Sequence, residues 1–258
     1  MINIIFFDID GTTYQHNIHN NPASTKLALN ELKNKGYKLV ICTSRSFEEM
    51  KTLPSDFTDV MDCIICCGGA QIIYSNEDVE NITIDHEEIV RGFEYFDKND
   101  IPYRYVYKFR SYLSTDDQDI TIRYKRLYNM IPDMKYYNGE KISHLLFYTN
   151  DKNHIDNINN IFKSSYRIDY GFAHECLPEN VNKGEALRKV AAHFGFSADE
   201  SAAFGDGNND VEMLKTAKIG VAMGNASDSC KAAADYVTDD IENDGLYKAC
   251  IAFGWINK

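Results

Sequence analysis

Residues 4–12 read IIFFDIDGT, and this stretch decides the fold that we expect for the rest of the chain. Its apolar run is typical of a strand buried on both faces of a parallel sheet. The strand ends in Asp8 and Asp10, which start on the same side because side chains alternate along a strand. Gly11 then allows a sharp turn. Two acids at this place are costly unless a cation or a reaction uses them, although a simple acidic turn is the alternative.

The composition limits the classes of partner. The chain has 258 residues, enough for one large α/β domain or two smaller ones, and its 44% hydrophobic content is typical of a soluble globular protein. The net charge of −12 argues against nucleic acid or an anionic membrane as a partner. The same charge repels phosphorylated substrates at long range, so a phosphate site would need a metal ion or a placed lysine. No window approaches the length of a transmembrane helix.

The seven cysteines predict a reducing compartment, because their number is odd and their spacing resembles no disulfide framework. We therefore expect a cytoplasmic protein, without a signal peptide, since Asp8 and Asp10 interrupt the N-terminal apolar run. Residues 63–67 (CIICC) resemble a metal or redox motif, but they lie in an apolar run and no matching Cys/His pair accompanies them. Buried strand thiols are the favoured interpretation.

The first 83 residues alternate strands and helices. Parallel strands follow from this spacing, and because their carboxyl ends meet at one edge of a sheet, Thr43 should lie near Asp8. Ser46 and Glu49 have the spacing of a capping box for a short helix. The other elements expected here are a helix at 24–35 and strands at 37–42 and 63–67.

Residues 84–180 differ in character and predict a separate α+β domain that is inserted into the first. This segment holds twelve of the 17 tyrosines, which we attribute to sheet packing, with a ligand-facing subset as the alternative. Residues 117–129 are ambiguous between helix and strand. The other elements expected here are helices at 87–96 and 155–162 and strands at 103–107, 143–148 and 167–172.

The α/β pattern resumes at residue 181. A helix is expected to end at Gly195, and a strand at 201–204 runs into residues 205–210, which read GDGNND. The remaining expected elements are strands at 219–223 and 236–237 and a helix at 228–234.

Polar residues from four places are expected to meet at one edge of this sheet, where the ligands of open α/β folds bind. They are Asp8 and Asp10, Thr43 and Ser44, Lys183, and Asp206, Asn209 and Asp210. Carboxylates suit Mg²⁺, and a hydroxyl and an ammonium suit phosphate oxygens. Each residue alone has a simpler explanation: Lys183 could be a solvated lysine at a helix start, and Asp210 an acid that interacts with a helix dipole.

In this order the motifs resemble those of the haloacid dehalogenase-like (HAD) phosphatases, specifically the Cof-type hydrolases with a large α/β cap. The matching stretches are 8–12 (DIDGT), 43–45 (TSR), 182–184 (NKG), 205–210 (GDGNND), 221–226 (VAMGNA), 233–238 (AADYVT) and 243–245 (NDG). The chain departs from the family pattern at Ser44, where glycine is usual, and at Gly68, where asparagine is usual. The second departure removes a side chain near the expected site.

The resemblance implies an α/β fold with a Rossmann-like core, built on a parallel sheet, and an inserted α+β cap domain. The core would comprise residues 1–83 and 181–258, and the cap residues 84–180.

The resemblance also implies the chemistry. Asp8 would be the nucleophile that takes the phosphoryl group as an aspartyl-phosphate, and Asp10 the general acid and then the general base. Mg²⁺ would be held by Asp8, the Asp10 backbone carbonyl and Asp206, with Asp210 reached through water. The phosphate oxygens would be held by Ile9, Thr43, Ser44, Lys183 and Asn209.

We therefore expect a Mg²⁺-dependent phosphatase whose partner is a small-molecule phosphate ester, with a sugar phosphate as the first candidate. A phosphomutase of the same superfamily is one alternative. A phospho-acceptor signalling domain is another, but the insert at 84–180 argues against it. A catalytically dead binding protein is disfavoured by the presence of both Asp8 and Asp10. No oligomeric state is predicted.

Overall fold

The computed structural model of the protein describes residues 1–74 and 79–257. The chain forms two compact units. The first unit comprises Met1–Ser44, Leu53–Val79 and Asn182–Lys258, and the second Arg45–Thr52 and Glu80–Val181. The structure therefore groups Arg45–Thr52 with the inserted part of the chain, whereas the sequence-based boundaries kept this segment in the core.

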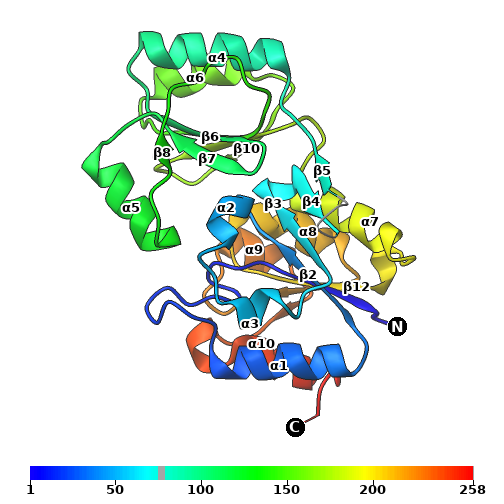
Figure 1. Ribbon diagram of the computed structural model, residues 1–258. Coiled ribbons are helices and arrows are strands. Elements are labelled where there is room, and N and C mark those ends of the chain that lie inside the picture. The colour runs from blue at the N-terminus through cyan, green and yellow to red at the C-terminus, as the bar shows by residue number, and fades with distance from the viewer. Residues whose placement is uncertain (75–78, 258) are drawn as a thin grey trace. The chain divides into compact units, whose positions relative to one another are not determined.

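A sheet of eight strands forms the centre of the first unit (Figure 1). The strands are β1 (Ile4–Phe7), β2 (Lys38–Cys42), β3 (Cys63–Cys66), β4 (Gln71–Ile73), β5 (Val79–Asn81), β12 (Ser201–Gly205), β13 (Ile219–Ala222) and β14 (Tyr236–Val237). Their order is β14-β13-β12-β1-β2-β3-β4-β5, and the pairs from β14 to β3 are parallel, whereas β4 runs antiparallel to β3. The central strand β1 is fully buried, as its apolar sequence predicts.

Helices cover both faces of this sheet, as Figure 1 shows. They are α1 (Ala23–Asn34), α3 (Ser55–Thr58), α7 (Lys183–His193), α8 (Val211–Thr216), α9 (Asp228–Ala233) and α10 (Gly245–Ala252), with 3₁₀ turns at Cys67–Gly69, Ala198–Glu200, Asn208–Asp210 and Ile241–Asn243. Leu187 and Val190 of α7 and Met213 of α8 join the apolar cluster formed by Phe6 and Val40 of the sheet. This packing places the start of α7 close to the carboxyl ends of the strands.

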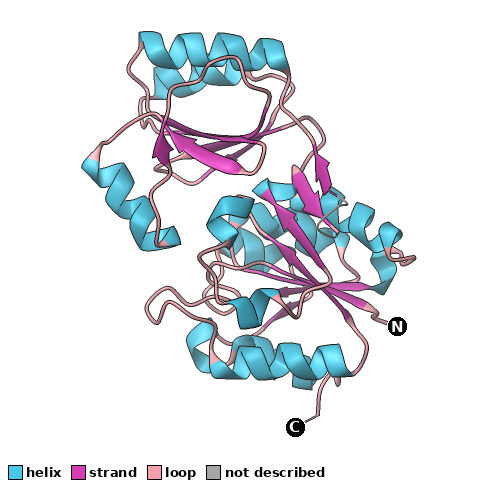
Figure 2. Ribbon diagram, in the orientation of Figure 1, coloured by secondary structure: helices cyan, strands magenta, loops and turns pink. Residues whose placement is uncertain are grey.

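The second unit contains a six-stranded sheet with helices α4 (His86–Lys98) and α6 (Lys152–Ile161) on one face (Figure 2). Its strands are β6 (Tyr103–Tyr107), β7 (Arg110–Leu113), β8 (Asp133–Met134), β9 (Ile142–Phe147), β10 (Tyr166–Asp169) and β11 (His174–Leu177). The order is β10-β11-β9-β6-β7-β8, and every pair is antiparallel except β7–β8. Two further helices, α2 (Phe47–Met50) and α5 (Gln118–Tyr128), belong to the same unit.

Aromatic side chains fill the space between this sheet and its helices. The rings of Tyr103 and Tyr105 lie edge-on to Phe93, with centroids 4.6 and 5.8 Å apart, and both tyrosines are buried. These tyrosines therefore pack the sheet. The alternating pattern of the sequence predicted this use of aromatic residues.

A buried ion pair explains why α2 groups with the second unit. Arg104 of β6 donates from Nη2 to Glu49 Oε1 at 2.5 Å, and both side chains are 1% exposed. Ser111 of β7 donates to the same carboxylate oxygen at 3.0 Å and lies 2.8 Å from Ser46 Oγ. The predicted capping box of Ser46 and Glu49 is present. Glu49 therefore both caps α2 and fastens it to the second sheet.

The predicted fold class is confirmed: a parallel α/β core carries an inserted α+β unit. The ambiguous residues 117–129 form helix α5, with Asp117 accepting the N–H groups of Asp119 and Ile120. All seven cysteines are buried, including the three in the run at 63–67 that the sequence predicts as buried strand thiols. Within the described residues, no helix is long and apolar enough to cross a membrane.

Candidate active site

The turn after β1 is fixed by its own backbone. Asp8 is 5% exposed and donates its N–H to the Phe204 carbonyl of β12 at 3.0 Å. The N–H groups of residues 12–14 all donate to the Ile9 carbonyl, at 2.8 to 3.2 Å, and Thr13 Oγ1 donates to the Asp8 carbonyl at 2.8 Å. These bonds close a turn over residues 9–14 directly after Asp8, and Asp10 lies within it.

Gly11 allows another carboxylate to approach this turn. Its φ is 86°, and a Cβ at this position would lie 2.2 Å from Asp206 Oδ2. Thr12 Oγ1 donates to Asp206 Oδ1 at 3.0 Å, and Asn225 Nδ2 donates to the Gly11 carbonyl at 2.8 Å. Any side chain at position 11 would push Asp206 away, so the glycine is required by the close approach as well as by the turn.

Lys183 lies between two carboxylates at the start of α7. It is 1% exposed, and its Nζ donates to Asp8 Oδ1 at 2.5 Å and to Asp210 Oδ1 at 2.6 Å. Burial alone would lower the pKa of Lys183, but the charges of Asp210 and Asp8 more than offset this and raise the pKa well above its usual value. The interpretation of Lys183 as a solvated lysine is therefore wrong.

Asp210 organises the loop after β12. Its side chain is fully buried, and Oδ2 accepts the N–H groups of Asp206 and Gly207, both at 2.9 Å. Its other oxygen accepts Lys183. Asp210 therefore ties the loop that carries Asp206 to the lysine that contacts Asp8.

Three carboxylates form a cluster that suits a divalent cation. Asp8, Asp206 and Asp210 each offer one oxygen, and these oxygens lie within 4.8 Å of one another. Burial first, and then the charge of Asp210, raise the pKa of Asp8 well above its usual range and that of Asp206 to about 7. Lys183 balances only one of these negative charges. The surplus charge and the oxygen-only donor set fit Mg²⁺.

The loop after β2 brings further predicted residues together. Asn209 Nδ2 donates to Ser44 Oγ at 3.1 Å, and the buried Thr43 accepts the Gly68 N–H at its carbonyl at 3.0 Å. Gly68 has a φ of 61°. Asparagine and glycine are the residues that adopt this conformation most readily, so glycine in place of the family's asparagine keeps the backbone of the loop.

The structure thus brings the polar residues that follow β1, β2 and β12 together with the start of α7, as their positions at strand ends predict. Several residues that hold the site were not predicted to do so. Thr12 and Asn225 lie in the motifs at residues 8–12 and 221–226, so these motifs could have identified both residues as part of the site. His16, which contacts Asp10, lies outside all of these motifs.

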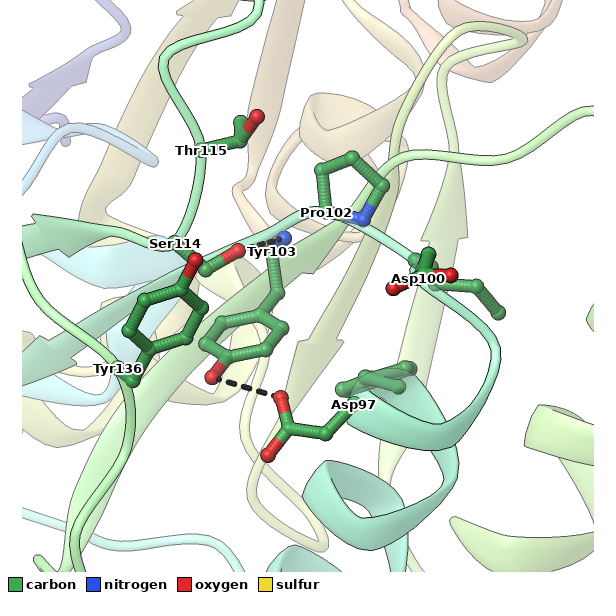
Figure 3. Close-up of a pocket in the computed structure, with 9 residues that line it drawn as sticks. Asp97, Asp100, Pro102, Tyr103, Ser114, Thr115 and Tyr136 are labelled. Atoms are coloured by element: carbon green, nitrogen blue, oxygen red, sulfur yellow. Dashed lines mark hydrogen bonds between the residues drawn. The ribbon is translucent and has the colours of Figure 1, made fainter.

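A separate cavity of about 300 Å³ lies in the second unit, at the C-terminal end of α4 (Figure 3). Tyr103 Oη donates to Asp97 Oδ1 at 3.2 Å, and Ser114 Oγ accepts the Tyr103 N–H at 2.9 Å. The half-exposed ring of Tyr136 also lines it. Because its buried hydroxyls are engaged with the protein, this cavity carries no functional assignment.

A sequence model of the haloacid dehalogenase-like hydrolases matches residues 5–250. The chain belongs to this family. The match covers both units, and it agrees with the motifs at residues 8–12 and 205–210. The predicted family is therefore confirmed, and so is the prediction that this chain is an enzyme.

Relatives of this HAD hydrolase match along almost the whole chain. A protein of Bacillus subtilis (strain 168) that carries the provisional name phosphatase YkrA is 28% identical, over 97% of each chain. The structure of the HAD subclass IIB sugar phosphatase BT4131 superposes with a TM-score of 0.88 at 27% identity, covering 98% of this chain and 100% of the other. A structure from a study of a phosphoryl-transfer superfamily gives a TM-score of 0.90 at 27% identity, covering 99% and 100%.

Proposed function

We propose that this HAD hydrolase is a Mg²⁺-dependent phosphatase that hydrolyses small phosphate esters, with sugar phosphates as the first substrate class to test. The observation that carries the proposal is the position of the Asp8 carboxylate at the end of β1. One of its oxygens accepts a hydrogen bond from Lys183, and the carboxylate belongs to the cluster of three acids. A buried carboxylate held in this way is suited to accept a phosphoryl group. The relatives named as phosphatases support this interpretation.

Mg²⁺ would be held by Asp8, the Asp10 backbone carbonyl and Asp206, with Asp210 supporting the Asp206 loop. The ion would neutralise the charge of the substrate phosphate next to a cluster that otherwise repels it. Lys183 would hold a phosphate oxygen from the other direction. Thr43, Ser44, Asn209 and the Ile9 N–H would hold the remaining oxygens. Such positioning and charge neutralisation is most of what phosphoryl transfer requires.

In the first step, an oxygen of Asp8 attacks phosphorus, and the bond from phosphorus to the leaving oxygen breaks. Asp10 gives its proton to that oxygen, so that an alcohol leaves. In the second step, Asp10 takes a proton from water, and the resulting hydroxide attacks the aspartyl-phosphate. Asp8 is regenerated, and inorganic phosphate is released with the proton back on Asp10.

The second unit is the part of the chain to which we assign substrate choice. The phosphoryl site recognises only groups that every phosphate ester offers, so discrimination has to come from elsewhere in the protein. The name of the structural relative BT4131, a sugar phosphatase, makes sugar phosphates the first class to test.

The test is release of inorganic phosphate from a panel of sugar phosphates and from p-nitrophenyl phosphate, with Mg²⁺ and with a chelator. We expect Mg²⁺-dependent release by the wild type. Asp8→Asn should lose at least about a thousandfold in rate while unfolding at an unchanged temperature, because the nucleophile is gone. Asp59→Asn, at an exposed position of the same unit, is the matched control.

Three outcomes would count against the proposal. A rate for Asp8→Asn within tenfold of wild type would exclude the covalent mechanism. Release that persists in the chelator would exclude the metal. Phosphate transferred to a second sugar without release would show the phosphomutase instead.

A further inference from the structure

Asp10, the proposed general acid for the leaving group, contacts His16, a residue outside the family motifs. His16 Nε2 lies 3.0 Å from Asp10 Oδ1, and both side chains are 29% exposed. We propose that His16 is a positioning residue for Asp10, which holds its carboxyl group in one orientation so that the proton is carried on Oδ2 toward the leaving oxygen. This inference rests on the proposed function, in which Asp10 is the general acid.

The direction of the hydrogen bond follows from the chemistry of both groups. An ionised carboxylate only accepts, so the His16 ring must donate from Nε2. The other ring nitrogen, Nδ1, is buried and has no hydrogen-bond partner within the described residues. The geometry therefore fits a ring that carries a proton on Nε2 and donates it to Asp10 Oδ1.

This hydrogen bond has a consequence for the proton of Asp10. When Asp10 is protonated, one oxygen carries the proton and the other is a carbonyl oxygen that accepts hydrogen bonds. An N–H group on Oδ1 makes that atom the acceptor, so the proton sits on Oδ2. The bond to His16 can therefore form in both protonation states of Asp10, and it selects the same oxygen as the proton carrier in each turnover.

The loop that carries His16 holds the ring in place. The ring of buried Tyr14 packs edge to face against it, with centroids 5.4 Å apart and an interplanar angle of 82°. Tyr14 is in turn fixed by its N–H, which donates to the Ile9 carbonyl at 2.8 Å. Gln15 and Asn20 close the loop through a pair of backbone hydrogen bonds of 2.9 and 3.4 Å.

All of these contacts lie within the first unit. Asn17 and Gln15 also hydrogen-bond Glu242 of the same unit, at 3.1 and 3.3 Å. The contacts described here that place His16 on Asp10 therefore come from the first unit.

Two substrates of similar shape separate the positioning role from a general loss of structure. The p-nitrophenolate of p-nitrophenyl phosphate leaves without a proton, whereas the more basic phenolate of phenyl phosphate needs the acid more. The measurement is the single-turnover rate of phenol release with saturating Mg²⁺, which reports the first step alone. We expect His16→Ala to lower the rate with phenyl phosphate about tenfold, which is less than the full contribution of a general acid. The rate with p-nitrophenyl phosphate should stay nearly unchanged.

Three further variants make the result specific. His16→Gln keeps an N–H donor near the Nε2 position and should restore the rate with phenyl phosphate to within about threefold of wild type. His19→Asn removes an imidazole from the same loop at an exposed position of positive φ that asparagine tolerates, and it should behave as wild type. In an Asp10→Asn background, His16→Ala should have no further effect, because the two residues act as one unit.

The inference is overturned if His16→Ala slows both substrates equally, if His16→Gln fails to restore the rate, or if the loss persists in the Asp10→Asn background. A wild-type enzyme that releases neither phenol would contradict the proposed function itself, and is therefore distinguishable. Unchanged thermal unfolding of the variants checks that the loop is intact.

Discussion

A single side chain, Lys183, holds the charges of the candidate site together. It contacts Asp8 and Asp210 directly, and Asp210 holds the backbone of the loop that carries Asp206. An interaction with both acids makes Lys183 part of the architecture of the site as well as a candidate phosphate ligand. Its loss should therefore affect stability and catalysis together.

We predict that Lys183→Met destabilises the metal-free protein by about 3–5 kcal/mol at pH 8, because two buried carboxylates lose their counterion. The loss should be smaller at pH 5, because burial raises the pKa of Asp8 well above its usual range and this carboxylate can take up a proton in the folded state. Denaturant unfolding at both pH values measures this. Lys189→Met, on an exposed position of the same helix, is the control and should stay near wild type. Equal losses at both pH values would contradict the assignment.

The sequence predicted which polar residues lie together at this edge of the sheet better than it predicted the contacts between them. The positions of Asp8 and Asp206 after parallel strands were enough to place them at one edge of the sheet. The close approach of Asp206 to Gly11 depends on the turn after β1, which no sequence pattern encodes. His16 could not be predicted, because one imidazole in a polar loop has no spacing that distinguishes it.

Among the elements, strands with apolar sequences such as β1 were predicted well, whereas some strands with polar residues, β11 among them, were missed. The residues of β1 are apolar and buried, whereas β11 (His174–Leu177) is equally buried but contains His174 and Glu175. The buried carboxylate of Glu175 is hydrogen-bonded to His144, and it accepts a hydrogen bond from Tyr170 Oη at 2.7 Å. Polar side chains of such a strand can be buried because they are paired with other residues. The strand then lacks the apolar pattern by which a buried strand is predicted.

Helix α5 remained ambiguous for another reason. Ile120, Tyr124 and Leu127 have the spacing of a helix face, but Ile120, Ile122 and Tyr124 also alternate as in a strand, so the sequence fits both. Its ends carry the clearer signal: Asp117 caps the first turn, and Asn129 ends the helix with a φ of 53°.

The contact of α4 with α6 depends on the absence of a side chain at Gly92. A Cβ there would lie 2.2 Å from Cζ of Phe162, which is fully buried. We predict that Gly92→Ala lowers the free energy of unfolding by about 1 kcal/mol, because overpacking of about 1–3 kcal/mol exceeds the gain in helix propensity. Denaturant unfolding measures the change. Glu94→Ala, an exposed position of the same helix, should not destabilise, and a stabilised Gly92→Ala would refute the packing argument.

For the whole molecule, the acidic cluster couples stability to pH and to Mg²⁺. Burial raises the pKa of Asp206 to about 7, and that of Asp8 well above its usual range, against about 3.9 in the unfolded chain. The metal-free folded state therefore binds more protons than the unfolded state between about pH 4 and pH 7. The cluster's contribution to stability falls as the pH rises through this window.

We predict that Mg²⁺ raises the unfolding temperature more at pH 8 than at pH 5.5, because at the lower pH it has to displace a proton from the cluster. Thermal unfolding with Mg²⁺ and with a chelator measures both shifts. Asp206→Asn should reduce the difference between the two pH values. Equal shifts at the two pH values would show that Mg²⁺ does not bind this cluster.

Because all seven thiols are buried, their reaction with an alkylating reagent measures how often the surrounding structure opens. Alkylating reagents need an exposed thiolate, and burial raises the pKa of Cys176 and of Cys250 far above the usual value for a thiol. A reagent can therefore reach them only while the surrounding structure is open. Cys176 lies in the second unit and Cys250 in the first, so the order in which the two are labelled records which unit unfolds first.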